Sequence, residues 1–149
     1  MARTIVKYSG GMDFSGALIQ VAHLVDSAFA EGCRVCGLTA QQGKLLCQLN
    51  FGPMGMGCLS RKLDLEKSSV SGLVDRVERQ GLVKRVRDPH DRRAWAVELT
   101  DTGQRMAHRT HEEIGARIGA LGEALKPAER EALTRFVADM AESRNAPAF

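Results

Sequence analysis

The sequence lacks any long apolar run, and it lacks an apolar segment near its N-terminus. No stretch of the 149 residues approaches the roughly 20 apolar residues that a membrane helix needs. Residues 1–7 do not have the apolar centre of a signal peptide. The hydrophobic fraction of 44% and the charged fraction of 26% are typical of a soluble globular protein. We therefore expect a cytoplasmic protein with one domain, residues 1–149, that is long enough to bury a core.

Motifs of enzyme active sites are also lacking. The sequence has no glycine-rich phosphate loop, no nucleophile elbow and no His-Glu metal motif. It has no low-complexity tract and no repeat period either. We therefore expect a protein that is not an enzyme and that carries no cofactor.

Positive charge is gathered in one part of the chain. The formal net charge is only +3, but residues 61–93 hold ten Lys or Arg and six Asp or Glu. The remainder of the chain is slightly acidic. Such a segment is either a solvated basic face or the footprint of a protein that binds a polyanion.

The hydrophobic pattern predicts three helices, then a fourth helix with a β-hairpin, then two further helices. A loose arm of about the first dozen residues comes before them. Thr39 and Gln42 form a capping box for the second helix. The expected helices and strands are helix 14–32, a link at 33–37, a helix from Thr39, a break at 50–57, helix 56–63, a turn at 64–67, helix 68–80, strands 82–87 and 95–99, a helix capped by Thr100 or Asp101, and a helix opened by Pro127. The predicted fold class is mainly α with a small β-hairpin wing, a winged helix-turn-helix with terminal helices.

The helix at residues 68–80 has the pattern of a helix that enters the DNA major groove. Its apolar stripe consists of Val70, Leu73, Val74 and Val77. At about 100° per residue, the residues that then point outward together are Ser69, Gly72, Arg76 and Arg79. Ser68 and Ser71 flank this face, and Lys67 lies where free helix N–H groups favour phosphate. The same residues also suit the exposed polar face of an ordinary helix.

The hairpin favours DNA as the ligand. Its tip carries Arg92 and Arg93, and its stem carries Lys84, Arg85 and Arg87. An arginine held out on a hairpin can enter the narrow minor groove. We expect Asp91 to hold the Arg93 guanidinium in a fixed orientation. The predicted DNA-binding residues are Lys67, Ser68, Ser69, Ser71, Arg76, Arg79, Arg85, Asp91, Arg92 and Arg93.

Residues 73–103 resemble the recognition-helix and wing segment of the multiple-antibiotic-resistance regulator (MarR) family. The residues that resemble the family's signature are Asp91, Arg93, Leu99, Thr100 and Gly103. The resemblance extends over nearly the whole chain, because the flanking helices match in order and length. It is strongest over residues 68–103.

The resemblance implies a homodimer that reads a near-palindromic duplex. Residues 12–36 and 104–149 would be the dimerisation helices, and residues 38–103 the winged lobe. The usual action of the family is repression, although the sequence leaves activation open. A small-molecule effector would bind between the dimer helices and the winged lobe and change the spacing of the two lobes. It must bind the two shapes with different affinity.

Cys33 and Cys36 allow three interpretations. They form a redox switch, they hold a metal, or they pack as small apolar residues. A lone C-x-x-C is weak evidence for zinc, and a thioredoxin-like motif would need a βαβ pattern. In a cytosolic chain the four cysteines are expected as thiols. Cys47 is expected in the core, and Cys58 could lie in the core or outside it.

A metal held by Cys33 and Cys36 would take His108, His111 or His23 as a further ligand, and the candidates are His108 and His111, with Glu112 on the same side of the helix as His108. His108 and His111 share a helix face, which suits a metal and also suits a wet surface. Zinc-sensing relatives carry acid and histidine ligands where this chain has Gln41 and Gln42. Peroxide-sensing relatives carry their cysteine near the start of the first helix, where this chain has no cysteine.

An alternative function is a winged-helix module that binds protein without binding DNA. Such a module needs no basic wing tip, whereas this chain has Arg92 and Arg93. Reversing both charges separates the two functions, because only DNA binding would then weaken and lose part of its salt dependence.

Overall fold

The computed structural model describes residues 12–143. The expected N-terminal arm lies outside these residues, apart from Met12. The elements in chain order are α1 (Phe14–Val35), α2 (Ala40–Leu49), β1 (Met54–Gly55), α3 (Met56–Leu63), α4 (Lys67–Arg79), β2 (Val83–Arg87), β3 (Trp95–Leu99), α5 (Asp101–Ala120) and α6 (Pro127–Ser143). The predicted fold class is confirmed.

Local hydrogen bonds begin the helices where the sequence predicted. The Thr39 side chain accepts from the Gln42 backbone N–H at 3.2 Å, and the Gln42 side chain accepts from the Thr39 N–H at 3.0 Å. This reciprocal pair is the predicted capping box of α2. The turn between α3 and α4 is tight because Asp64 adopts a left-handed conformation, with φ 51°.

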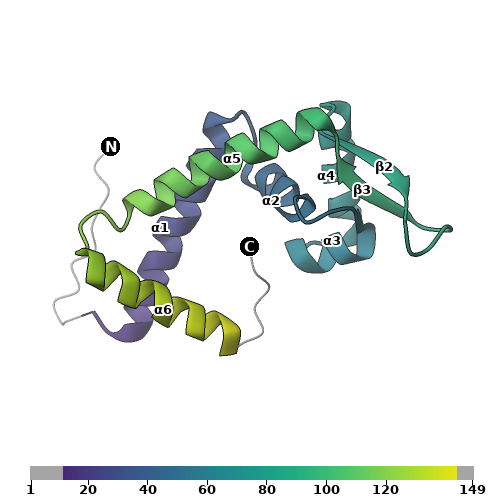
Figure 1. Cartoon of the computed structure of the whole chain (residues 1–149). Helices are drawn as coiled ribbons and strands as arrows, with labels where there is room; N and C mark the ends of the chain where they lie inside the picture. The colour runs from purple at the N-terminus through teal and green to yellow at the C-terminus, as the bar shows by residue number, and fades with distance from the viewer. Residues whose placement is uncertain (1–11, 144–149) are drawn as a thin grey trace.

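The sheet has one strand more than the sequence predicted. β2 and β3 form the expected antiparallel hairpin, and β1 pairs with the other edge of β3, so the strand order is β1-β3-β2. In Figure 1 the hairpin extends away from α4, at the opposite end of the molecule from α6.

One core joins the winged lobe to α1 and α5. The large side chains that are fully buried in it are Leu45, Leu46, Leu59, Val70, Val74, Val77, Val83 and Val97. α1 and α5 pack against each other, whereas α6 packs extensively against none of the other described elements. No helix of residues 12–143 is long and apolar enough to cross a membrane.

The junction between the hairpin and α5 is tightly packed. Thr100 caps α5 by accepting from the Gly103 N–H at 3.0 Å, and its hydroxyl donates to the Gly81 carbonyl at 2.6 Å. A Cβ on Gly103 would overlap the Leu82 carbonyl group. Gly103 is therefore required by the close approach of α5 to Leu82, directly before the start of β2.

The end of α1 corrects the predicted link at residues 33–37. The helix continues through Gly32 to Val35, so Cys33 lies within it. Position 32 needs a glycine because a Cβ there would lie 2.8 Å from Ile114 Cγ1 on α5. The glycine permits close packing of two helices and does not end the helix.

Candidate nucleic-acid interface

α4 presents the predicted face to solvent. Its apolar stripe of Val70, Leu73, Val74 and Val77 is buried, and Lys67 extends the helix one residue earlier than predicted. On the opposite side Lys67, Ser68, Ser69, Arg76 and Arg79 are exposed, while Ser71 and Gly72 are partly buried. The helix can thus offer short hydroxyl side chains and arginines together to one ligand.

The first turn of α4 is free to bind an anion. Glu66 occupies the N-cap position but makes no side-chain capping hydrogen bond to the described residues. Helix N–H groups that lack a capping side chain are donors for phosphate oxygens. Lys67 and Ser68 follow directly, which adds a positive charge and a hydroxyl at the same point.

The two arginines of α4 lie back along their own helix. Arg79 Nε donates to the Asp75 carbonyl at 3.3 Å. Arg76 reaches toward Gly72, where a Cβ would lie 3.8 Å from Arg76 Nη1. Both side chains are exposed and must extend to reach a base edge in the major groove.

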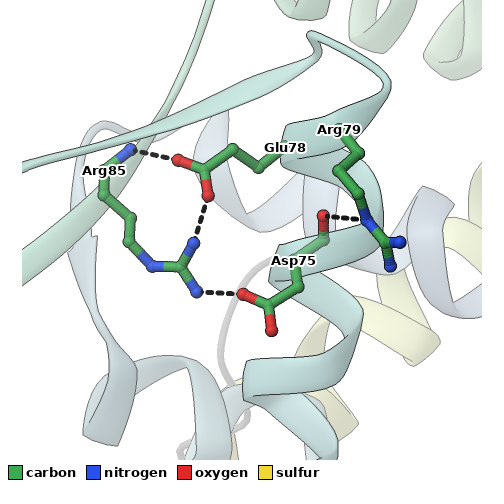
Figure 2. Close-up of polar contacts among 4 residues, drawn as sticks. All are labelled: Asp75, Glu78, Arg79 and Arg85. Carbon is green, nitrogen blue, oxygen red and sulfur yellow. Dashed lines mark hydrogen bonds and ion pairs between the residues drawn. The ribbon is translucent and has the colours of Figure 1, made fainter.

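Arg85 differs from its predicted role as a DNA contact. Figure 2 shows its guanidinium between two acids of α4: Nη2 lies 2.5 Å from Asp75 Oδ1, and Nη1 pairs with Glu78 Oε2. The backbone N–H of Arg85 also donates to Glu78 Oε1 at 3.2 Å. The hydrogen bond with Asp75 and the nearby Glu78 charge raise the pKa of Arg85 above its ordinary value. Arg85 therefore ties the wing to the helix, and its charge is already neutralised.

The hairpin tip is organised by two aspartates. Asp88 Oδ1 accepts from the backbone N–H groups of His90, at 2.8 Å, and Asp91. Asp91 Oδ1 accepts from the Arg93 backbone N–H at 3.0 Å. The prediction that Asp91 holds the Arg93 guanidinium is therefore corrected: within the described part of the chain it fixes the backbone of the tip. Arg92 and Arg93 are exposed there.

A contact at the base of the tip is not predicted by the sequence pattern. The Arg87 guanidinium lies over the Trp95 ring, with its central carbon 4.1 Å from the ring centroid. These residues are partners in the β2–β3 register. Pairing the two predicted strands residue by residue would have brought them together.

Cys33 and Cys36 are both buried. Cys33 Sγ packs on Gly43 of α2 so closely that a Cβ on this glycine would overlap it. Burial raises the pKa of the Cys33 thiol to about 11. Since the reactive species is the thiolate, this environment favours the packing interpretation of Cys33 over the redox one. Cys47 is half-buried, and burial raises its pKa also.

The histidine candidates lie on the outer surface of α5. His108 Nε2 is 3.3 Å from Glu112 Oε1, and both side chains are largely exposed, as is His111. Among residues 12–143 no three His, Cys, Asp or Glu side chains gather as a metal site would require. The geometry of the described chain therefore gives the metal interpretation no support.

A basic hairpin beside an exposed helix on a helix-turn-helix defines the class of winged-helix DNA-binding regulators. A family model described as the MarR family matches residues 38–95. The homoprotocatechuate degradative operon repressor of Escherichia coli is 30% identical over 99 residues, 66% of this chain and 67% of that protein. The uncharacterized HTH-type regulator YfiV of Bacillus subtilis (strain 168) is 30% identical over 97 residues, 64% of this chain, and the chain spans 61% of the length of that relative.

Solved structures agree on the fold. Wild-type MarR from E. coli superimposes with a TM-score of 0.76 at 22% identity, covering 86% of this chain and 96% of that one. The repressor CouR bound to a 23-mer DNA duplex gives a TM-score of 0.70 at 27% identity, covering 87% and 92%. The chain belongs to the MarR family of DNA-binding transcription regulators. The prediction that it is not an enzyme is confirmed by this membership.

Proposed function

We propose that this protein is a homodimeric repressor that binds a near-palindromic DNA site in the cytoplasm and is released by a small effector. The observation that supports a dimer is the apolar surface of the terminal helices. Phe14 on α1 is 70% exposed and Phe136 on α6 is 57% exposed. The other large apolar residues exposed on these helices are Leu18, Ile19, Val21, Leu24, Val35, Leu133, Val137 and Met140.

A second copy of this chain is the occupant that this surface fits. Helix α6 has no buried residue, although Leu133, Phe136, Val137 and Met140 form a stripe along it. An apolar area of this extent is unusual on a monomer. A two-fold dimer through residues 12–36 and 104–149 would cover the exposed apolar residues of α1 and α6 at once. It would leave two winged lobes, residues 38–103, for two half-sites.

The proposed DNA contacts follow from exposure and charge. The first turn of α4, with Lys67, Ser68 and Ser69, would bind phosphate, and Ser71 would lie beside it. Arg76 and Arg79 would extend to base edges in the major groove. Arg92 and Arg93 would enter the adjacent minor groove, with Asp91 fixing the backbone that carries them.

Repression is the action that we propose. The E. coli relative that shares 30% identity is a named operon repressor, and CouR is a repressor solved on DNA. The effector that we propose is a small organic ligand and not an oxidant or a metal. The buried Cys33 and Cys36 and the exposed, scattered histidines support this choice.

The test is a fluorescence-anisotropy titration against the DNA directly upstream of the protein's own gene. We expect tight binding that weakens steeply with salt. The double variant Arg92→Glu with Arg93→Glu should bind much more weakly and with a shallower salt dependence. Arg109→Glu with Lys126→Glu is the charge-matched control, because it makes the same charge change at two exposed positions outside α4 and the hairpin. Both positions lie within residues 104–149, so the control counts only where sedimentation shows that its oligomeric state equals that of the wild type.

A winged-helix module that binds protein gives a different result. It predicts no specific DNA complex, and it predicts that the wing variant and the control behave alike. Release of the DNA by an oxidant, or by added zinc, would contradict the proposed class of effector.

A further inference from the structure

The Arg87–Trp95 contact suggests a third DNA-binding point on the winged lobe. Arg87 ends β2 and Trp95 begins β3, so they form the outermost pair of the ladder, next to the loop that carries the tip arginines. The Trp95 side chain is 50% exposed although it is large and apolar, and Arg87 is exposed too. Neither side chain is needed to fill the core.

Arg87 differs from the other two basic residues of β2. Lys84 Nζ pairs with Glu98 at 3.0 Å, and Arg85 pairs with Asp75 and Glu78. Within residues 12–143, no carboxylate lies within ion-pair distance of Arg87. A ring over the face of a guanidinium also leaves the N–H groups at its edge available to another acceptor.

The register places Arg87 on the side of the hairpin that faces α4. Residues two apart on a strand share a face, so Arg85 and Arg87 point the same way. Arg85 reaches Asp75 and Glu78 of α4 from this face, as Figure 2 shows. The Arg87–Trp95 pair therefore lies one step beyond α4, between this helix and the tip with its exposed arginines.

A duplex on this lobe would bring one of its strands past that position. If α4 occupies a major groove and the tip occupies the neighbouring minor groove, the backbone strand between the two grooves crosses the stem of the hairpin. We propose that Arg87, oriented by the Trp95 ring, binds a phosphodiester oxygen of this strand, and that Trp95 is the residue that positions it. This inference rests on the DNA-binding mode proposed above.

The chemistry suits a phosphodiester. A guanidinium offers two parallel N–H donors to phosphate oxygens. The Trp95 ring restricts the rotamers of a flexible side chain, which reduces the entropy lost when the contact forms. The contact would add affinity without reading sequence.

Charge removal at Arg87 tests the phosphate contact. Arg87→Gln should weaken binding about tenfold and reduce the slope of log K against log salt by about 0.9 for each Arg87 that contacts phosphate. Lys84→Gln is the matched control, because it removes the same charge from the same strand on the opposite face, where Glu98 already pairs with it. It should change the slope much less.

The positioning role of Trp95 is tested by a double-mutant cycle. Trp95→Leu keeps the net charge and should weaken binding about 2- to 5-fold, while Trp95→Phe should retain part of the affinity. In the Arg87→Gln background, Trp95→Leu should have almost no further effect, because the residue that it positions is gone. Thermal unfolding of each variant checks that the fold is kept.

Trp95 also provides a direct readout, since it is the sole tryptophan of the chain. Its emission should change when saturating DNA is added. Unchanged emission, an unchanged salt slope for Arg87→Gln, or fully additive effects in the cycle would each overturn the inference. Absence of DNA binding by the wild-type protein would instead overturn the proposed function itself.

Discussion

Glu78 on α4 accepts two hydrogen bonds from Arg85 on β2, one from its backbone N–H at 3.2 Å and one from its guanidinium. For the bond from the backbone N–H, Glu78 only has to supply an acceptor oxygen. For the bond from the guanidinium, it also has to supply a negative charge. Asp75, one turn earlier, binds the other edge of the same guanidinium. One arginine thus fixes the angle between the helix and the hairpin that are proposed to enter neighbouring grooves.

We expect Glu78→Ala to destabilise the fold by about 1–2 kcal/mol, since it removes a half-buried ion pair and leaves the Arg85 N–H without its acceptor. Glu78→Gln should cost only about half as much, because the amide oxygen can still accept from the backbone. Urea unfolding followed by circular dichroism measures both. Equal losses for the two variants would show that the backbone bond contributes nothing.

The elements of this fold that the sequence predicted well have strong local signals. The stripe of α4 repeats every 3.6 residues, and Gly81, with φ 73°, ends the helix as expected. β1 was missed because two residues cannot show an alternating pattern. The sequence predicts a helix end at Gly32 because the actual need for this glycine, its close approach to Ile114, depends on a residue far along the chain.

The candidate site was predicted in the same uneven way. Exposure of Arg76, Arg92 and Arg93 follows from helix periodicity and turn chemistry, so the sequence identified them. The partners of Arg85 and Arg87 depend on how the hairpin packs on α4 and on strand register. Composition places basic residues on the hairpin, but only three-dimensional packing separates the neutralised Arg85 from the available Arg87.

Gly103 should be intolerant of any side chain. Gly103→Ala places a methyl group against the Leu82 backbone, which cannot move without disturbing the hairpin, so we expect a loss of about 1–3 kcal/mol or more in unfolding free energy. Gly115→Ala, on the same helix with open space around its Cβ position, should instead stabilise by about 0.5–1 kcal/mol. If both variants destabilise alike by thermal melting, the steric explanation is wrong.

Arg76 and Arg93 should affect DNA binding in different ways. Arg76→Ala removes a proposed base contact and should cost about 1–3 kcal/mol while relaxing the preference at one base position. Arg93→Ala should weaken binding to all sequences more evenly and make the salt dependence shallower. Competition assays against a library of single-base operator variants distinguish the two. Uniform weakening by Arg76→Ala would remove its role in base reading.

The oligomeric state should depend on the apolar stripe of α6. Phe136→Glu puts a charge in the centre of the stripe, and we expect it to shift the protein from dimer to monomer in analytical ultracentrifugation. Gln41→Glu makes the same charge change at an exposed position on α2, outside the proposed dimerisation helices, and should leave the dimer intact. A wild-type protein that sediments as a monomer would contradict the proposed assembly.

The thiol of Cys33 should behave as a packing group, and its burial should make the free energy of unfolding depend on pH in the alkaline range. Its pKa in the folded protein, about 11, lies above the ordinary value of 9.0 because burial disfavours the thiolate. The unfolded chain therefore loses this proton first, so stability is full below about pH 9 and falls as the pH rises toward 11. Cys33→Ala should reduce that fall, although it leaves a small cavity at every pH.

The same burial makes Cys33 slow to react. At pH 8 a thiol-specific reagent, with the labelled peptides identified by mass spectrometry, should modify the half-buried Cys58 before Cys33, whereas all four cysteines should react in denaturant. Because an unreactive thiol cannot sense an oxidant, Cys33 should add nothing to any peroxide response, so wild type and Cys33→Ser should bind DNA alike after peroxide. If oxidation abolished DNA binding in the wild type but not in Cys33→Ser, the redox interpretation would be restored. Oxidation would then require α1 to separate from α2, since Cys33 Sγ packs against Gly43.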